Sequence, residues 1–133
     1  MKIVAFNGSA RKNGNTAHLL NLALEEAAAA GLETELVELG GKPLRGCIAC
    51  YKCFERKNNR CTVEDDAIND YLAKMIEADG ILLGSPTYFA DVSAGMKALI
   101  ERCGMVTRAN GDLLKRKAGA GVMLPGPRHF TKV

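Results

Sequence analysis

Hydrophobic positions along the chain follow two periods, one typical of buried strands and the other of amphipathic helices. Short, mostly continuous apolar segments predict strands at residues 2–6, 33–39, 80–84 and 118–124. Apolar residues at helical spacing predict helices at residues 16–31, 65–78 and 93–103. The segment 33–39 partly alternates apolar and polar residues, so we expect it to lie nearer a sheet edge.

The alternation of strands and helices predicts an α/β domain with a doubly wound parallel sheet. In such a sheet, ligands bind beyond the carboxyl ends of the strands, near the point where the strand order reverses. We therefore expect three loops to converge on one site, namely those that follow Phe6, Gly84 and Leu124.

Composition assigns residues 1–133 to a single globular domain, because 47% of the residues are hydrophobic and 25% are charged. A formal net charge of only +3 and the absence of Trp argue against nucleic acid as a partner. No window approaches the roughly 18 apolar residues of a membrane span, and the amino terminus has no signal-type pattern. We therefore expect a cytoplasmic protein without a membrane partner.

The segment from Gly8 to Thr16 joins the first predicted strand to the first predicted helix and has the composition of an anion site. Its glycines, its small hydroxyl and amide side chains and Arg11 suit a phosphate at a helix N-terminus. Asn15 stands where a Walker loop has lysine and no G-x-G-x-x-G is present, so ATP and a Rossmann dinucleotide are disfavoured. The alternative is a polar turn in which Asn15 or Thr16 caps the helix.

The third predicted strand is followed by Ser85-Pro86-Thr87-Tyr88-Phe89. Two aromatic side chains, a rigid proline and the neighbouring backbone donors suit the apolar wall and polar edge that a flat, amphiphilic ring requires. The alternative is a turn whose aromatic side chains cap the core.

Residues 40–62 follow neither period, and so long a loop in a compact domain is either functional or disordered. It holds the pattern Cys47-x2-Cys50-x2-Cys53-x7-Cys61. Four thiolates suit an iron-sulfur cubane or a structural zinc ion, and three closely spaced cysteines favour the cubane. Disulfides are the remaining alternative.

Basic side chains outnumber acidic ones around these cysteines, by 6 − 1 = +5 over residues 42–61. This charge favours the addition of an electron to an anionic cluster, or the docking of an acidic electron carrier.

The other reactive side chains receive no catalytic role. Cys103 lies on an apolar helix face and is expected to be a small buried hydrophobe. His18 and His129 have no partnered acid or nucleophile in the sequence. Asp65 and Asp66 are explained by favourable electrostatics at the start of a helix.

Together these motifs resemble the iron-sulfur flavoproteins, a branch of the flavodoxin-like NAD(P)H-dependent FMN reductase superfamily. The resemblance covers residues 1–124. It rests on three segments, which are Gly8-Ser9-x-Arg11-Lys12-Asn13-Gly14-Asn15-Thr16, the cysteine segment, and Gly84-Ser85-Pro86-Thr87-Tyr88-Phe89.

The resemblance implies FMN and a 4Fe-4S cluster as cofactors. It assigns the FMN phosphate to Ser9, Arg11, Asn13, Asn15 and Thr16, with Ala17 at the helix start. It assigns the isoalloxazine ring to Pro86, Thr87, Tyr88 and Phe89, and Ser93 to the flavin or a neighbouring subunit. It assigns the cluster to Cys47, Cys50, Cys53 and Cys61.

The implied role is electron transfer from a ferredoxin-like donor, through the cluster and FMN, to a small oxidised acceptor. One alternative is an NAD(P)H-dependent FMN or quinone reductase whose cysteines bind zinc or nothing. A second alternative is a non-enzymatic interaction module with a zinc-binding loop, in which the first loop only caps a helix.

The sequence departs from the family pattern in two ways. Ala10 stands where a proline is usual. A flavodoxin-like sheet has five strands in the order 2-1-3-4-5, and we expect the fifth strand and the last helices to be missing from this chain, because residues 125–133 are too few to form them. Either the sequence is a fragment of a longer chain, or a partner subunit covers part of the sheet. We expect a homodimer or homotetramer to cover the sheet face left bare.

Overall fold

The computed structural model describes residues 1–125. Its elements are β1 (Lys2–Asn7), α1 (Asn15–Ala29), β2 (Glu33–Glu38), α2 (Lys52–Arg56), α3 (Ile68–Glu77), β3 (Gly80–Tyr88), β4 (Asp91–Val92), α4 (Ala94–Ala109) and β5 (Ala118–Leu124).

The parallel strands form a sheet in the order β2-β1-β3-β5, and the short β4 pairs antiparallel with β3. The predicted doubly wound parallel sheet is therefore confirmed, with β5 as its fourth parallel strand. The expectation that the chain cannot supply a fifth strand concerns residues 126–133, which lie outside the described residues.

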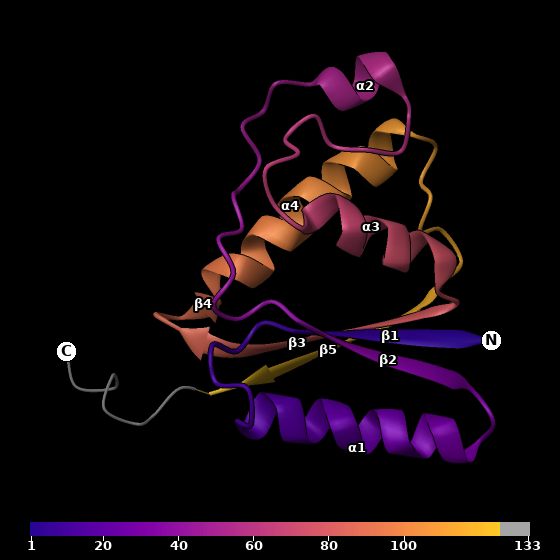
Figure 1. Cartoon of the computed structure of the whole chain (residues 1–133), viewed down its shortest axis with the longest axis vertical. Helices are drawn as coiled ribbons and strands as arrows, with labels where there is room; N and C mark the ends of the chain where they lie inside the picture. The colour runs from indigo at the N-terminus through magenta and orange to yellow at the C-terminus, as the bar shows by residue number, and fades with distance from the viewer. Residues whose placement is uncertain (126–133) are drawn as a thin grey trace.

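The sheet lies between two helical layers (Figure 1). Helix α1 covers one face, α3 and α4 cover the other, and α2 lies farther out beyond α4. Side chains of β1 alternate between the layers, as a covered strand requires. Val4 and Phe6 join the core with α3 and α4, whereas Ala5 packs with Leu20 and Leu24 of α1.

Strand β3 is longer than the sequence pattern predicts. It continues through Tyr88 and turns back into β4, so the expected loop is instead the end of a strand and a tight hairpin. Phe89 and Ala90 form the turn with positive φ angles of 46° and 66°. Two-residue hairpins need such angles but usually take them from Asn or Gly, so Phe89-Ala90 carries no recognisable turn signal.

Two helix predictions also need correction. The cysteine segment contains the unpredicted helix α2, which has left-handed residues at both ends, Tyr51 and Lys57. Helix α3 begins at Ile68, so Asp65 and Asp66 precede its first turn. Asp66 nevertheless contributes to the helix start, because its Oδ1 accepts a hydrogen bond from the Ile68 amide at 3.1 Å.

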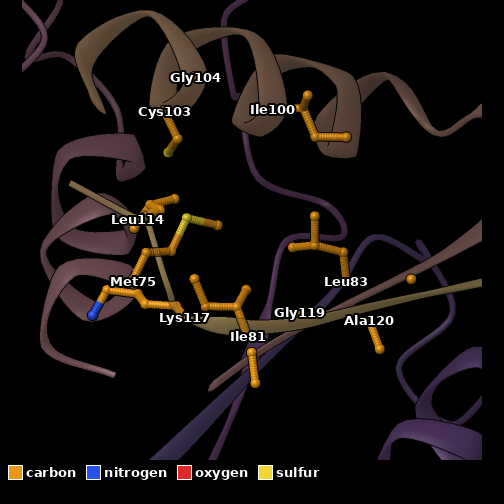
Figure 2. Close-up of a pocket in the computed structure, with 12 residues that line it drawn as sticks. Met75, Ile81, Leu83, Ile100, Cys103, Gly104, Leu114, Lys117, Gly119 and Ala120 are labelled. Carbon is orange, nitrogen blue, oxygen red and sulfur yellow. The ribbon is translucent and has the colours of Figure 1, made fainter. Parts of the chain in front are cut away.

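An apolar cavity of about 450 Å³ lies between β5 and the helices on the same face (Figure 2). It is lined by Ile81 and Leu83 from the sheet, Ile100 and Cys103 from α4, and small residues of β5. Strand β5 is largely exposed, so the described residues leave this end of the sheet uncovered. None of the helices within residues 1–125 combines the length and the apolar run needed to cross a membrane.

Gly40 lies where the chain after β2 passes directly against the loop after β1. A Cβ atom at this position would be 2.1 Å from the Ser9 carbonyl oxygen and 2.8 Å from the Ala10 Cα, so the backbone would have to move. We expect Gly40→Ala to lower the free energy of unfolding by about 1–3 kcal/mol, the usual cost of overpacking. Urea denaturation measures this change.

Gly104→Ala is the matched control. A Cβ atom at this position of α4 meets nothing within 4 Å, so the change should raise the free energy of unfolding by about 0.5–1 kcal/mol through helix propensity. Equal effects of the two substitutions would contradict the close approach at Gly40.

Candidate functional site

The carboxyl ends of the parallel strands border a cavity of about 1010 Å³. Three segments line it, from the loop after β1, the end of β3 and the end of β5, as the parallel topology predicts. The lining residues are Ser9, Arg11, Asn13, Gly14, Asn15, Thr16, Pro86, Thr87, Tyr88, Phe89, Leu124 and Pro125. All the predicted FMN residues except Ala17 and Ser93 are therefore brought together at one cavity.

Asn7, at the end of β1, holds the first loop in place. Its side chain is fully buried, donates to the Glu38 carboxylate at 2.7 Å and accepts from the Ser9 amide at 3.0 Å. The Ser9 hydroxyl in turn accepts from the Arg11 amide at 3.1 Å. The loop is thus shaped by its own side chains, and its polar groups border a space of suitable size for a ligand.

The alternative in which this loop only caps a helix is wrong. The N-cap of α1 is Gly14 in an extended conformation, and no side chain in the described structure makes the capping hydrogen bond. Asn15 is the first helical residue and is exposed. The N-terminus of α1 therefore faces the cavity without a capping side chain, which favours an anion there.

The aromatic side chains at the end of β3 and in the turn that follows it do not cap the core. Tyr88 is 45% exposed and Phe89 is 92% exposed, and both border the cavity. They present an apolar surface beside the polar first loop, so one side of the cavity suits a ring and the other an anion.

Ala17 and Ser93 are buried and do not line the cavity. Ala17 is buried within α1. Ser93 is the N-cap of α4, where its hydroxyl accepts from the Met96 amide at 3.3 Å, and its own amide donates to the Ser85 hydroxyl at 2.9 Å. Ser93 thus joins α4 to the strand that carries the aromatic wall.

The cysteine segment forms a second candidate site. All four of its cysteines line one cavity of about 20 Å³, together with Arg102 and Met105 of α4. This volume holds about one water molecule. All five cysteines are free thiols, so the disulfide alternative is wrong for this structure.

The backbone between these cysteines turns repeatedly through the left-handed region. Ala49, Tyr51, Lys57 and Asn59 have φ angles between 46° and 59° and lie in the intervals between the cysteines. Non-glycine residues adopt such angles infrequently and at a cost in energy, so their number in this segment is a reason to examine it as a functional site. All four thiols of this segment border the same cavity. As they stand, however, no three His, Cys, Asp or Glu side chains within residues 1–125 form a group that could hold a metal ion.

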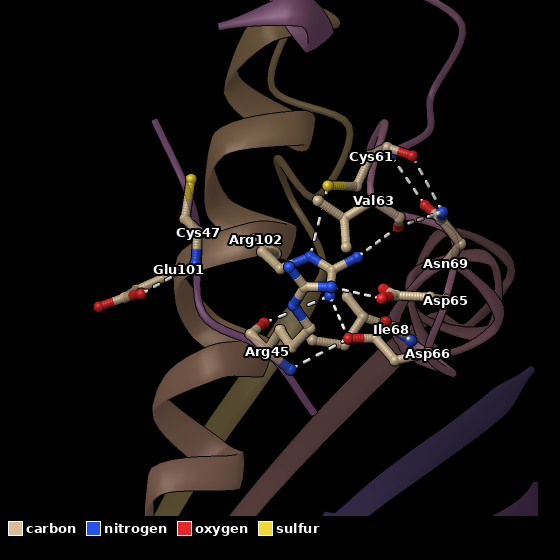
Figure 3. A network of polar contacts seen from close by, with 10 residues as sticks. All are labelled: Arg45, Cys47, Cys61, Val63, Asp65, Asp66, Ile68, Asn69, Glu101 and Arg102. Carbon is tan, nitrogen blue, oxygen red and sulfur yellow. Dashed lines mark hydrogen bonds and ion pairs between the residues drawn. The ribbon is translucent and has the colours of Figure 1, made fainter. Parts of the chain in front are cut away.

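Helix α4 is the platform to which the segment is attached. Glu101 accepts from the Cys47 amide at 3.3 Å, and Asn110 accepts from the Asn59 amide at 3.2 Å. Arg102, which is only 1% exposed, lies between them and contacts Cys61 (Figure 3). Opposite α4, Asn69 of α3 accepts from the Cys61 amide at 2.8 Å and donates to its carbonyl at 3.0 Å.

Sequence reasoning missed Asn7, Asn69, Glu101 and Arg102. Asn69 and Arg102 are polar residues within otherwise buried helix faces, since Ile68 and Leu72 flank the first and Leu99 and Cys103 the second. An isolated polar residue on an apolar face needs a buried partner. The isolated polar residues could therefore have been recognised in the sequence, but their partners could not have been identified from it.

Burial raises the pKa of two thiols, those of Cys53 and Cys103. It raises the pKa of Cys53, and the neighbouring Cys50 and Cys61 thiolates raise it further, against backbone hydrogen bonds that lower it. Burial also raises the pKa of Cys103 to about 12. The prediction that Cys103 is a small buried hydrophobe is confirmed by its 3% exposure.

The whole of this sequence, residues 1–133, matches the NADPH-dependent FMN reductase family. The chain belongs to that family. An iron-sulfur flavoprotein of Methanocaldococcus jannaschii is 41% identical over 129 residues, which are 97% of this chain and 64% of the relative. An iron-sulfur flavoprotein of Methanosarcina thermophila is 36% identical over 97% of this chain and 65% of the relative. The chain therefore spans just under two thirds of the length of these family relatives.

Solved structures agree on the fold. RosB with a bound riboflavin-phosphate intermediate superposes with a TM-score of 0.73 at 19% identity, covering 100% of this chain and 55% of that protein. The apo NADH:FMN oxidoreductase EmoB superposes with a TM-score of 0.65 at 20% identity, covering 98% and 61%. The flavodoxin-like fold of this family member is thus shown.

The ion pair between Asp66 and Arg102 is completely buried, with side-chain exposures of 1% and 0%. Burial would raise the pKa of Asp66, but hydrogen bonds from the Arg45 and Ile68 amides and from the Arg102 guanidinium hold it below its usual value. We expect Asp66→Ala to cost about 3–5 kcal/mol at pH 7, because it leaves the buried cation without a partner.

The pH dependence has a defined sign. A carboxylate whose pKa is lower in the folded chain contributes its full stability above the unfolded pKa of about 3.9 and loses it as pH falls through the folded value. The difference in the free energy of unfolding between wild type and Asp66→Ala should thus be constant above about pH 5 and shrink below pH 4.

Asp65→Ala is the control. The side chains of Asp65 and its partner Arg45 are 57% and 58% exposed, so this pair should contribute less than about 1 kcal/mol. Equal losses in the two variants, measured by urea denaturation, would contradict this assignment.

Proposed function

We propose that this chain binds FMN in the cavity at the carboxyl edge of the sheet and acts as an FMN-dependent oxidoreductase. The observation that carries the proposal is the shape of that cavity, in which the helix N-terminus and polar loop face the exposed aromatic pair Tyr88 and Phe89. The phosphate would lie against Ser9, Arg11, Asn13, Asn15 and Thr16, and the ring against Pro86, Thr87, Tyr88 and Phe89. Family membership supports this choice of cofactor.

We further propose that Cys47, Cys50, Cys53 and Cys61 hold a 4Fe-4S cluster. The donor set fits, because four free thiols border one cavity. The cavity of about 20 Å³ must widen to admit a cubane, and, apart from Cys53 on the short helix α2, the cysteines lie outside helices and strands. The names of the relatives support the same cofactor.

The cluster would supply single electrons and FMN would exchange one or two. The surface around the cysteines suits a protein donor, since Ile48, Tyr51 and Phe54 are exposed apolar side chains beside the exposed basic residues Lys52 and Arg56. Such a patch fits an acidic, ferredoxin-like electron carrier. A small oxidised acceptor and a homodimer or homotetramer complete the proposal.

A reductase without a functional cluster is the second candidate. It is favoured by one observation, that no group of side chains in the described part of the chain is arranged for a metal. Such a protein would bind FMN, take electrons from NAD(P)H and contain no iron. The zinc-loop module is less favoured, because the first loop supplies no capping side chain to α1 and instead lines the large cavity.

Arg11→Gln should weaken FMN binding about tenfold, because it removes a charge-assisted hydrogen bond to the phosphate. Lys12→Gln removes the same charge from the same loop at a residue that does not line the cavity, and it should leave the affinity nearly unchanged. Quenching of flavin fluorescence measures both. Equal weakening would show that the loop attracts FMN only through its net charge.

Cys50→Ala should remove most of the iron and acid-labile sulfide from protein purified without oxygen, while bound FMN stays. Cys103→Ala is the control, because Cys103 is buried in the core away from the cysteine cavity, and it should keep both cofactors. The visible spectrum together with iron, sulfide, zinc and flavin counts measures the result. Wild-type protein with FMN but no iron would select the cluster-free reductase, and protein that binds no FMN would exclude the proposed function.

A further inference from the structure

Arg102 is the largest fully buried side chain of the described residues. Its guanidinium donates hydrogen bonds to the cysteine segment and to the residues on either side of it. Its Nε donates to the Cys61 sulfur at 3.3 Å, and its Nη2 donates to the Val63 carbonyl at 2.6 Å. Its Nη1 donates to the Arg45 carbonyl at 3.2 Å and to the Asp66 carboxylate. Figure 3 shows these partners around the guanidinium.

These contacts reach both flanks of the segment. Arg45 precedes the first cysteine of the segment by two positions, and Val63 follows the last cysteine by two. One planar fork therefore closes the segment into a loop and touches the sulfur of its last cysteine. Lysine cannot replace this fork, because its three donors lie on a single nitrogen and cannot reach acceptors spread as widely as those around the guanidinium.

We propose that Arg102 is a positioning residue for the cluster, which fixes Cys61 and both flanks of the cysteine segment and favours the reduced state through its N–H donor to the Cys61 sulfur. The inference rests on the cluster proposed above. One-electron reduction adds negative charge to the cluster and its sulfur ligands without making or breaking a bond. A donor and a cation beside a ligand sulfur stabilise that added charge, so they raise the reduction potential.

Burial distinguishes Arg102 from the other basic residues of this region. The side chains of Arg45 and Arg60 are 58% and 51% exposed, so solvent and salt screen their charge. Arg102 is paired with Asp66, which offsets much of its net charge. The directional N–H donor to sulfur is therefore the main difference that Arg102 makes at Cys61.

The first test compares the reduction potential and iron content of loaded variants, followed by EPR during redox titration. Arg102→Lys keeps the charge and loses the fork, and D66N/R102Q removes the buried pair together, so that no unpaired charge remains to unfold the chain. Each should lower the reduced-to-oxidised ratio at a fixed potential about tenfold, which is about 59 mV for a one-electron couple, or should lose iron while still folded. Arg108→Gln is the control, because Arg108 lies on the same helix with its side chain 73% exposed, and it should match wild type.

Variants that hold the cluster with the wild-type potential would overturn the inference and leave Arg102 a structural residue only. A second measurement needs no variant. Loaded, reduced wild-type protein containing arginine labelled with ¹⁵N in the guanidinium should show a ¹⁵N coupling in pulsed EPR. Absence of that coupling would overturn the contact with Cys61. Wild-type protein that takes up no cluster would instead overturn the cluster proposal itself.

Discussion

Parallel pairing of β1 with both of its neighbours is the constraint on which the FMN cavity depends. β1 pairs through Asn7 with Glu38, where β2 ends, and with Gly84 of β3, beyond which β3 continues to Tyr88. Two backbone hydrogen bonds extend this pairing beyond the strands, from Gly8 to Gly84 at 2.7 Å and from Leu39 to Asn7 at 2.9 Å. Loops that are far apart in the sequence are thereby brought to one edge of the sheet.

The cysteine segment is stabilised differently, because it has little regular structure with which to satisfy its backbone groups. Buried side chains of α3 and α4 supply the missing hydrogen-bond partners, and most of these come from Asn69 and Arg102. Such polar anchors fix one arrangement at the cost of desolvating a charge. Apolar packing alone would leave the segment's amides and carbonyls unpaired.

The local pattern of apolar and polar residues was sufficient to predict the parallel sheet and three of the helices, because buried strands and amphipathic helices have periodicities that can be recognised within a few residues. It was also sufficient to bring the first loop and the residues after Gly84 to one place, because topology fixes where strands end. It failed at Phe89 and Ala90, where non-glycine residues adopt positive φ against their local preference. It also failed at Arg102 and Asp66, whose pairing joins residues 36 positions apart and leaves no periodic trace.

Helix α4 has a second property, which follows from its rigidity. Its first turn is joined to β3 through Ser93, and Arg102 contacts Cys61 nine positions farther along, about 13 Å at the usual helical rise. The length of the helix therefore sets the distance between the two candidate sites. Inserting a single residue between those positions would rotate one end against the other by about 100° and swing the guanidinium away from the sulfur. The length of this span is therefore constrained, because the contact of Arg102 with Cys61 depends on it.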